Sequence, residues 1–186
     1  MKTLILNGSP RKNGDTVRLI ELFREKSGFD CTVFPVCEKK IAPCTDCRFC
    51  HTHPSCALRD DMEEFWRELS DAELILLASP IYFGQPSPQL LSWASRLQYA
   101  FVSERIRKDP DFSVGKRQGA LLFAAGGGTK NPKPAIQTGK EILRFCGADY
   151  IGTAAAMNTD RIPVEQDLQA KKSVEALVQL LLSSAK

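Results

Sequence analysis

The most informative stretch of the chain is Thr3-Leu4-Ile5-Leu6-Asn7-Gly8-Ser9-Pro10-Arg11-Lys12-Asn13-Gly14-Asp15-Thr16. Its first four residues are apolar and β-prone, so we expect a first strand at Thr3–Leu6. The polar segment Asn7–Pro10, with a glycine and a proline, ends that strand. Asp15 or Thr16 can then cap a helix. The apolar face of this helix is expected to comprise Val17, Ile20, Leu22 and Phe23.

The loop between this strand and this helix has the chemistry of a phosphate site. A phosphate there would meet free backbone N–H groups and the positive end of the helix dipole. Ser9 and Thr16 offer hydroxyl donors, and Arg11 offers a fork that matches phosphate oxygens. The glycines allow the backbone to approach closely. The alternative is a tight strand–helix turn whose polar residues are incidental.

The spacing of the loop excludes two other nucleotide-binding patterns. A Walker A loop is excluded because Asn13, Gly14 and Asp15 occupy the stretch where its Gly-Lys-Ser/Thr would fall. The G-x-G-x-x-G dinucleotide fingerprint is absent because Pro10 stands where its second glycine should be.

Strand and helix signals alternate along the rest of the chain. This alternation predicts one α/β domain over residues 1–186, with helices on both faces of a five-stranded parallel sheet. Right-handed crossovers favour a flavodoxin-like three-layer sandwich with strand order 2-1-3-4-5. The further strands are expected at Cys31–Val36, Leu74–Ala78, Ala120–Ala125 and Tyr150–Ala156, and the further helices from residue 60 or 61, over 90–101, over 134–146 and over 164–184.

A second ligand loop is expected after the third strand. Open α/β sheets bind ligands at the carboxyl ends of strands where the strand order reverses, here between strands 1 and 3. The loop there can present backbone amides and two aromatic rings to a planar polar ring; it comprises Pro80, Ile81, Tyr82, Phe83 and Gly84. The other side of the ring can be closed by Gly126, Gly127 and Gly128 after the fourth strand. Aromatic side chains beside prolines also occur simply as packing residues.

Composition indicates a globular protein with redox or metal chemistry. The apolar fraction of 43%, the charged fraction of 25% and the net charge of +3 give no sign of nucleic-acid binding. No apolar run approaches the roughly 20 residues of a membrane span. The apolar run after Met1-Lys2 is too short for a signal peptide, so we expect a cytoplasmic location. Seven cysteines in a reducing compartment suggest metal or redox sites rather than disulfides.

Four of these cysteines form a dense run in a loop over about 37–59. They follow the spacing C-x2-C-x2-C-x5-C and can converge on one metal centre; they are Cys44, Cys47, Cys50 and Cys56. The repeat every third residue is typical of iron–sulfur ligand runs. Zinc remains possible because His51 and His53 lie in the same loop, although zinc favours paired C-x2-C arms. A loop of metal-free thiols is the third alternative. Buried small hydrophobes are expected at Cys31, Cys37 and Cys146.

Leu6–Arg11 with Gly14–Thr16, followed by Ser79–Gly84, resembles the NADPH-dependent FMN reductase family of flavodoxin-like proteins. The cysteine run with Asp60-Asp61-Met62 after it resembles the iron–sulfur flavoprotein branch of that family. The resemblance implies FMN, with its ring at Pro80–Gly84 and a [4Fe–4S] cluster on the four cysteines. It also implies that the phosphate end of FMN is held by Ser9, Arg11, Asn13, Asp15 and Thr16.

Two positions depart from the family pattern. Asp15 stands where the family commonly has asparagine, and a carboxylate beside a phosphate is unfavourable unless it caps the helix or turns away. Ser95-Arg96 stands where the family often has Asp-Arg, so no role is carried over to this pair.

The function expected from these features is that of an FMN-dependent oxidoreductase or electron-transfer flavoprotein. Its donor would be NAD(P)H or a ferredoxin-like protein, and its acceptor a small molecule or another protein. The alternatives are a cluster-free FMN or quinone reductase and a non-catalytic zinc- or thiol-based redox sensor. No residue stands out as a general acid or base, and hydride transfer to a flavin needs none. The helix with Trp93 and Phe101 can form a subunit contact, so a homodimer or homotetramer is expected.

Overall fold

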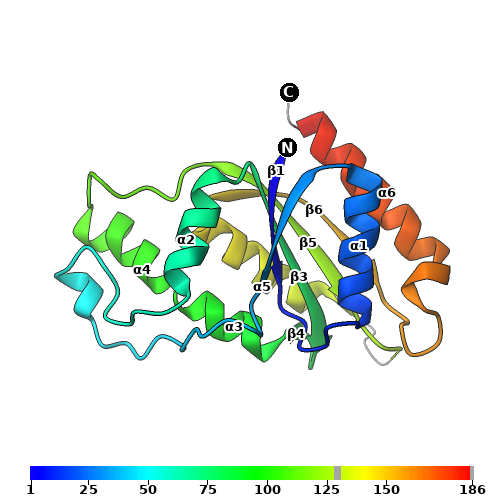
Figure 1. Ribbon diagram of the computed structural model, residues 1–186, viewed down its shortest axis with the longest axis horizontal. Coiled ribbons are helices and arrows are strands. Elements are labelled where there is room, and N and C mark those ends of the chain that lie inside the picture. Colours follow the sequence, from blue (N-terminus) through cyan, green and yellow to red (C-terminus); the bar gives the residue numbers. More distant parts are fainter. Residues whose placement is uncertain (128–130, 185–186) are drawn as a thin grey trace.

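A mostly parallel sheet forms the centre of the molecule (Figure 1). The computed structural model describes residues 1–127 and 131–184. The parallel strands lie in the order β2-β1-β3-β5-β6, which is the predicted 2-1-3-4-5 order, and the short strand β4 pairs antiparallel with β3. β4, which brings the sheet to six strands, was not predicted. The strands are β1 (Lys2–Asn7), β2 (Asp30–Pro35), β3 (Leu74–Tyr82), β4 (Gln85–Pro86), β5 (Arg117–Ala124) and β6 (Ala148–Ala156).

Helices cover both faces of the sheet, as the alternating pattern predicts. One face carries α1 and α6, and the other carries α2, α3 and α5 (Figure 1). Among the described residues, no helix is both long and apolar enough to cross a membrane. The helices are α1 (Asp15–Ser27), α2 (Met62–Asp71), α3 (Pro88–Ser95), α4 (Gln98–Phe101), α5 (Lys133–Phe145) and α6 (Leu168–Ser184), with short turns η1 (Phe49–His51) and η3 (Val164–Gln166) and a π-helix η2 (Val102–Arg107).

The two layers of core follow from the alternation of side chains along each strand. In β1, Leu4 and Leu6 face the α2, α3 and α5 layer, whereas Ile5 faces α1 and α6. All three are at most 2% exposed. A strand buried on both faces must be apolar at successive positions, which is why β1, β3 and β5 read as continuous apolar runs.

The loop after β1 is fixed against the start of α3. The Gly8 amide donates to Ala78 O at 2.8 Å, and the buried Ser87 hydroxyl donates to Gly8 O at 2.7 Å. The same hydroxyl accepts from Leu90 N at 3.3 Å and so caps α3. A Cβ at Gly8 would lie 2.9 Å from Leu90 Cβ, so this close approach requires glycine. The ligand edge of the sheet is therefore rigid where β1 and β3 end.

Three of the differences from the predicted element boundaries have a clear physical reason. β3 continues through Pro80 to Tyr82, because β5 pairs alongside it as far as Ala124 and β4 then pairs with its end. The helix predicted over 90–101 is divided, because hydrogen bonds tighten to i→i−3 at Arg96 and Leu97. The last helix starts at Leu168 rather than at residue 164, because the Asp167 carboxylate accepts from Gln169 N at 2.8 Å and Ala170 N at 3.0 Å.

Replacing Ser87 with alanine should destabilise the protein by about 1–3 kcal/mol, because Gly8 O and Leu90 N both lose a buried partner. Urea unfolding of the variant measures this. The matched control is Ser70→Ala, which removes an exposed hydroxyl from α2 and should shift stability by less than about 0.5 kcal/mol. Equal stability of the two variants would refute the role given to Ser87.

Candidate functional site

A pocket opens at the carboxyl ends of the strands, where sequence analysis expected the flavin. Residues of the phosphate loop, the end of β3 and the segment after β5 line it together. Of the predicted cofactor residues it includes Ser9, Arg11, Asp15, Thr16, Pro80, Ile81, Tyr82 and Gly126. Others are not part of its lining: Asn13, Phe83, Gly84 and Gly127. Gly128 lies outside the described residues.

The phosphate loop is held by its own polar groups and leaves the start of α1 open. Asn7 Oδ1 accepts from Ser9 N at 3.0 Å, and Ser9 Oγ accepts from Arg11 N at 3.2 Å. Gly14 is the N-cap of α1, and no side-chain cap bonds to the first turn of this helix. The first amides of α1 are therefore available to an anion. Thr16 is buried at this end and Arg11 is exposed at its rim.

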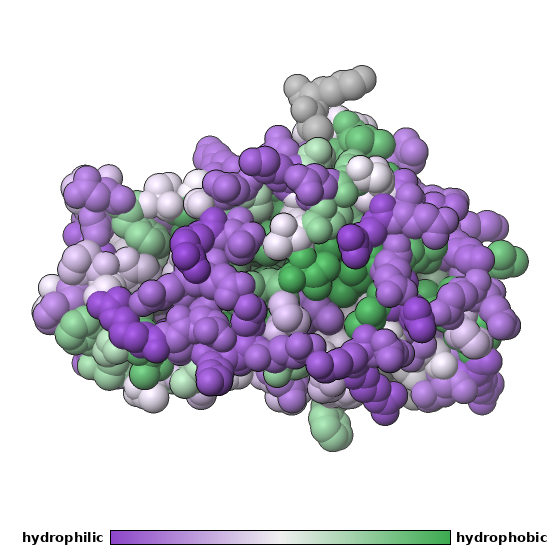
Figure 2. Space-filling model, viewed as in Figure 1, coloured by the Kyte–Doolittle hydropathy of each residue, from purple (hydrophilic) through white to green (hydrophobic). Residues whose placement is uncertain are grey.

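The turn between β3 and β4 projects from the same edge of the sheet. Phe83 and Gly84 both have positive φ, at 52° and 75°, as a two-residue hairpin turn requires. The Phe83 side chain is fully exposed, and Tyr82 is 40% exposed. Figure 2 shows apolar atoms protruding at the lower edge, where Figure 1 places this turn. An exposed aromatic turn beside a polar pocket can cover a planar ligand.

Two polar residues of this pocket, Thr159 and Asp160, were not predicted from the sequence. They follow β6, and Asp160 Oδ2 accepts from Gly127 N at 3.2 Å. The polar run Asn158-Thr159-Asp160 directly after the last predicted strand was the signal that could have found them. With Asp15, Asp160 brings a second carboxylate to the pocket, so its anion-binding side is confined to the loop and the start of α1.

The four cysteines of the run line a second pocket together: Cys44, Cys47, Cys50 and Cys56. The first two are exposed and the last two are half-buried. Burial raises the pKa of the Cys50 thiol, and the charges of the other three cysteines raise it further. Among the described residues, no three His, Cys, Asp or Glu side chains are grouped closely enough to hold a single metal ion. The thiols thus share one pocket without meeting at one point.

Outside the run, the remaining cysteines are buried to different degrees. Cys146 is fully buried, as predicted, and burial raises its pKa to about 12. Cys31 and Cys37 are only half-buried.

Strained backbone turns give the cysteine loop its shape. Asp46 and Arg48 have φ of 51° and 59°, a conformation that residues with a Cβ adopt infrequently. The short turn η1 follows directly and contains Cys50. The chain therefore reverses between the cysteines, which brings them to one pocket, and the surrounding structure must hold this shape.

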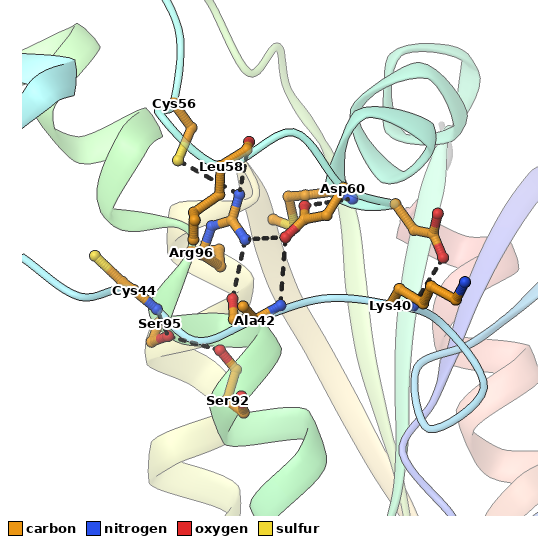
Figure 3. Close-up of polar contacts among 11 residues, drawn as sticks. Lys40, Ala42, Cys44, Cys56, Leu58, Asp60, Ser92, Ser95 and Arg96 are labelled. Atoms are coloured by element: carbon orange, nitrogen blue, oxygen red, sulfur yellow. Dashed lines mark hydrogen bonds and ion pairs between the residues drawn. The ribbon is translucent and has the colours of Figure 1, made fainter.

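Arg96 closes the base of the loop (Figure 3). Its guanidinium donates to Ala42 O at 2.9 Å and to Asp60 Oδ2 at 2.6 Å, and these two residues flank the cysteine run. It also donates to Cys56 Sγ at 3.4 Å. The Arg96 side chain is 2% exposed and that of Asp60 is 14% exposed, so this is a buried ion pair.

The ion pair controls the charge state of both partners. Burial acts to raise the pKa of Asp60, but the hydrogen bond from Arg96, together with backbone donors, outweighs it and leaves the pKa below its usual value. Burial likewise acts to lower the pKa of Arg96, and the bond to Asp60 reverses this direction. Both groups therefore stay ionised.

Further polar side chains, from the last residue of α3 to the end of η2, hold the loop backbone. Ser95 Oγ accepts from Cys44 N at 2.9 Å, and Tyr99 Oη donates to Pro54 O at 3.1 Å. Arg107, at the end of the π-helix η2, donates to Cys50 O at 3.2 Å and also to His53 O. Side chains from residues 95–107 thus supply hydrogen-bond partners at several positions of the loop.

Comparison with known proteins identifies the family. The family model for NADPH-dependent FMN reductases matches residues 1–161. The chain belongs to the NADPH-dependent FMN reductase family. It is accordingly an FMN-dependent oxidoreductase with a flavodoxin-like fold. The resemblance carried by Leu6–Thr16 and Ser79–Gly84 is confirmed.

Relatives of this FMN reductase family member include iron–sulfur flavoproteins. One from Archaeoglobus fulgidus is 36% identical over 142 residues, covering 75% of this chain and 68% of that protein. One from Methanosarcina thermophila is 25% identical, covering 82% of this chain and 78% of that protein. The NAD(P)H:quinone oxidoreductase from Methanothermobacter marburgensis shares the fold with a TM-score of 0.66 at 15% identity, over 96% of this chain and 93% of the other.

Replacing Asp60 with asparagine should destabilise this FMN reductase family protein by about 3 kcal/mol at neutral pH, because the substitution leaves the Arg96 charge buried and unpaired. The pKa of Asp60 is lower in the folded protein than in the unfolded chain. The stabilisation that the ionised carboxylate gives to the fold is therefore complete above the pKa of the unfolded chain, and it is lost as pH falls through the pKa of the folded protein. The stability gap between wild type and Asp60→Asn should therefore narrow below about pH 4.

Denaturant unfolding between pH 3 and 7 measures this gap. The control is Glu63→Gln, which removes an exposed ion pair with Arg59 and should change stability by less than about 1 kcal/mol. A gap for Asp60→Asn that stays constant down to pH 3 would contradict the depressed pKa.

Proposed function

We propose that this FMN-dependent oxidoreductase passes electrons between a reduced donor, FMN and a [4Fe–4S] cluster bound by the cysteine run. The observation that carries the proposal is the shared pocket of four thiols, closed by the buried Arg96–Asp60 pair. Flavins accept two electrons as a hydride and can release them singly, whereas iron–sulfur clusters carry one electron at a time.

The flavin would lie in the pocket at the carboxyl ends of the strands. Its phosphate would be held by Ser9, Arg11 and Thr16 with the open amides of α1. Asp15 would act through the helix dipole at the first turn rather than by touching phosphate, and Asn13 would contribute from the exposed part of the loop. The ring would lie against Pro80, Ile81, Tyr82 and Gly126, which line the pocket, with the neighbouring Phe83, Gly84 and Gly127 outside its lining.

The geometry of the cysteine pocket favours a cluster over zinc. A zinc ion binds four ligands at about 2.0–2.3 Å, so its ligand atoms must meet around one point. A [4Fe–4S] cluster is larger, and its ligand sulfurs surround it at greater separation. Thiols that line one pocket without meeting at a single-ion site fit the larger group better. The His53 ring stacks on Phe49 at 3.8 Å instead of lining the pocket, so His51, which does line it, is the one imidazole of the loop placed to bind zinc there.

The electron donor and the electron acceptor are part of this proposal. The family description supports a reduced nicotinamide donor, and a ferredoxin-like donor is the alternative. The acceptor would be a small molecule or a protein. A homodimer or homotetramer also remains a proposal, but Trp93 does not support it: this side chain is buried at 1% exposure and packs against Phe65 at 4.8 Å.

Anaerobic reconstitution tests the cluster. Wild-type protein should hold FMN with about four irons and four sulfides per chain, and a Cys50→Ser variant should lose most of the iron and sulfide but keep FMN. The control is Cys37→Ser, outside the run, which should load normally. Flavin without iron or sulfide would leave a cluster-free FMN or quinone reductase, and bound zinc without flavin would leave a redox sensor.

The phosphate role of Arg11 is tested by FMN titration. Arg11→Ala should weaken FMN binding by about 1.5–3 kcal/mol, the scale of a hydrogen bond to a charged group. Lys12→Ala is the matched control, because Lys12 is exposed, pairs with Glu38 at 3.7 Å and is not part of the pocket lining. If both variants bind FMN as wild type does, Arg11 does not contact the phosphate.

A further inference from the structure

Arg96 makes one contact that closing the loop does not require. Its Nη1 donates to Asp60 Oδ2 and to Ala42 O, and both of these hydrogen bonds hold the loop against the end of α3. Its Nη2 faces the other way and donates to Cys56 Sγ at 3.4 Å, with Leu58 O at 3.5 Å beside it (Figure 3). One end of the guanidinium is thus neutralised by a carboxylate, and the other end points at a sulfur.

Cys56 is singled out by this contact. Among the hydrogen bonds of the described residues, no other side chain bonds to a sulfur of the run: Arg107 donates to Cys50 O, and Ser95 accepts from Cys44 N. Cys56 Sγ instead receives a charge-assisted bond from a cation that is itself 2% exposed. Such a bond is little screened by water.

A buried cation beside one ligand sulfur would bias the charge state of a bound cluster. The potential of an iron–sulfur cluster depends on its net charge and on hydrogen bonds to its sulfurs. Reduction of a bound cluster would add one electron, which reduced FMN would supply, and no covalent bond at Arg96 would form or break. The added negative charge would strengthen the attraction to Arg96 Nη2, so Arg96 would stabilise the reduced cluster more than the oxidised cluster.

We propose that Arg96 is a positioning residue that orients Cys56 and raises the reduction potential of the cluster, with Asp60 limiting that effect. This inference rests on the proposed cluster and names a regulation of that same site. A guanidinium that only clamped the loop would change stability and leave the potential unchanged. The two roles therefore separate in one measurement.

The experiment is a redox titration of the anaerobically reconstituted protein, followed by electron paramagnetic resonance of the cluster. Arg96→Gln should lower the ratio of reduced to oxidised cluster at least tenfold at a fixed ambient potential, which is about 59 mV for one electron. Arg96→Lys keeps the positive charge but lacks the planar fork of the guanidinium. Its ratio of reduced to oxidised cluster should therefore lie between that of Arg96→Gln and that of the wild type. Asp60→Asn leaves the cation less neutralised and should shift the ratio in the opposite direction.

Arg59→Gln is the control for removing a nearby positive charge. The Arg59 side chain belongs to the same loop but is 69% exposed and paired with Glu63, so the reduction potential of the cluster in Arg59→Gln should equal that of the wild type. If Arg96→Gln does not bind a cluster, the test rests on the other two variants, because Arg96→Lys should lower the cluster potential and Asp60→Asn should raise it. Loaded variants that all keep the wild-type potential would overturn this inference alone. A wild-type protein that takes up no iron or sulfide would overturn the proposed cluster and this inference with it.

Discussion

The buried ion pair between Arg96 and Asp60 is the interaction on which the cysteine loop depends. Of the described residues between β2 and α2, only the short turn η1 is helical, so the loop backbone has few hydrogen-bond partners of its own. Side chains from residues 95–107 supply them instead. Arg96 is the only one of these that joins both ends of the run, because it bonds to Ala42 and to Asp60. A buried charge pair fixes a geometry more than it adds stability.

The flavodoxin-like sheet brings two different chemistries to one molecule. Parallel strands put the loops after β1, β3, β5 and β6 at one edge, where they line the pocket proposed for the flavin. The loop after β2 starts at the same edge, but its turn η1 lies beside η2 (Figure 1), and Gln98 and Tyr99 of α4 help to line the cysteine pocket. Among the described residues, the two pockets share no lining residue. The fold therefore forms the pocket proposed for the flavin directly, whereas the cysteine pocket depends on long-range side-chain contacts.

Sequence pattern was sufficient for what local chemistry controls. Apolar runs predicted the parallel strands and right-handed crossovers predicted their order, and the polar loop between β1 and α1 lines one side of the pocket proposed for the flavin. The role of Arg96 was not predictable, because Asp60 lies 36 residues away and no local pattern links them. The division of the helix after Pro88 was missed for a related reason, since its tightened turn serves contacts with the distant loop.

Anomalous diffraction at the iron edge, from crystals of the anaerobically reconstituted protein, tests the central claim most directly. The account predicts iron density in the pocket of Cys44, Cys47, Cys50 and Cys56, with Arg96 Nη2 still within hydrogen-bond distance of Cys56 Sγ. A zinc signal in that pocket would contradict the account. Iron bound elsewhere, or an Arg96 side chain turned away from the sulfur, would contradict it too.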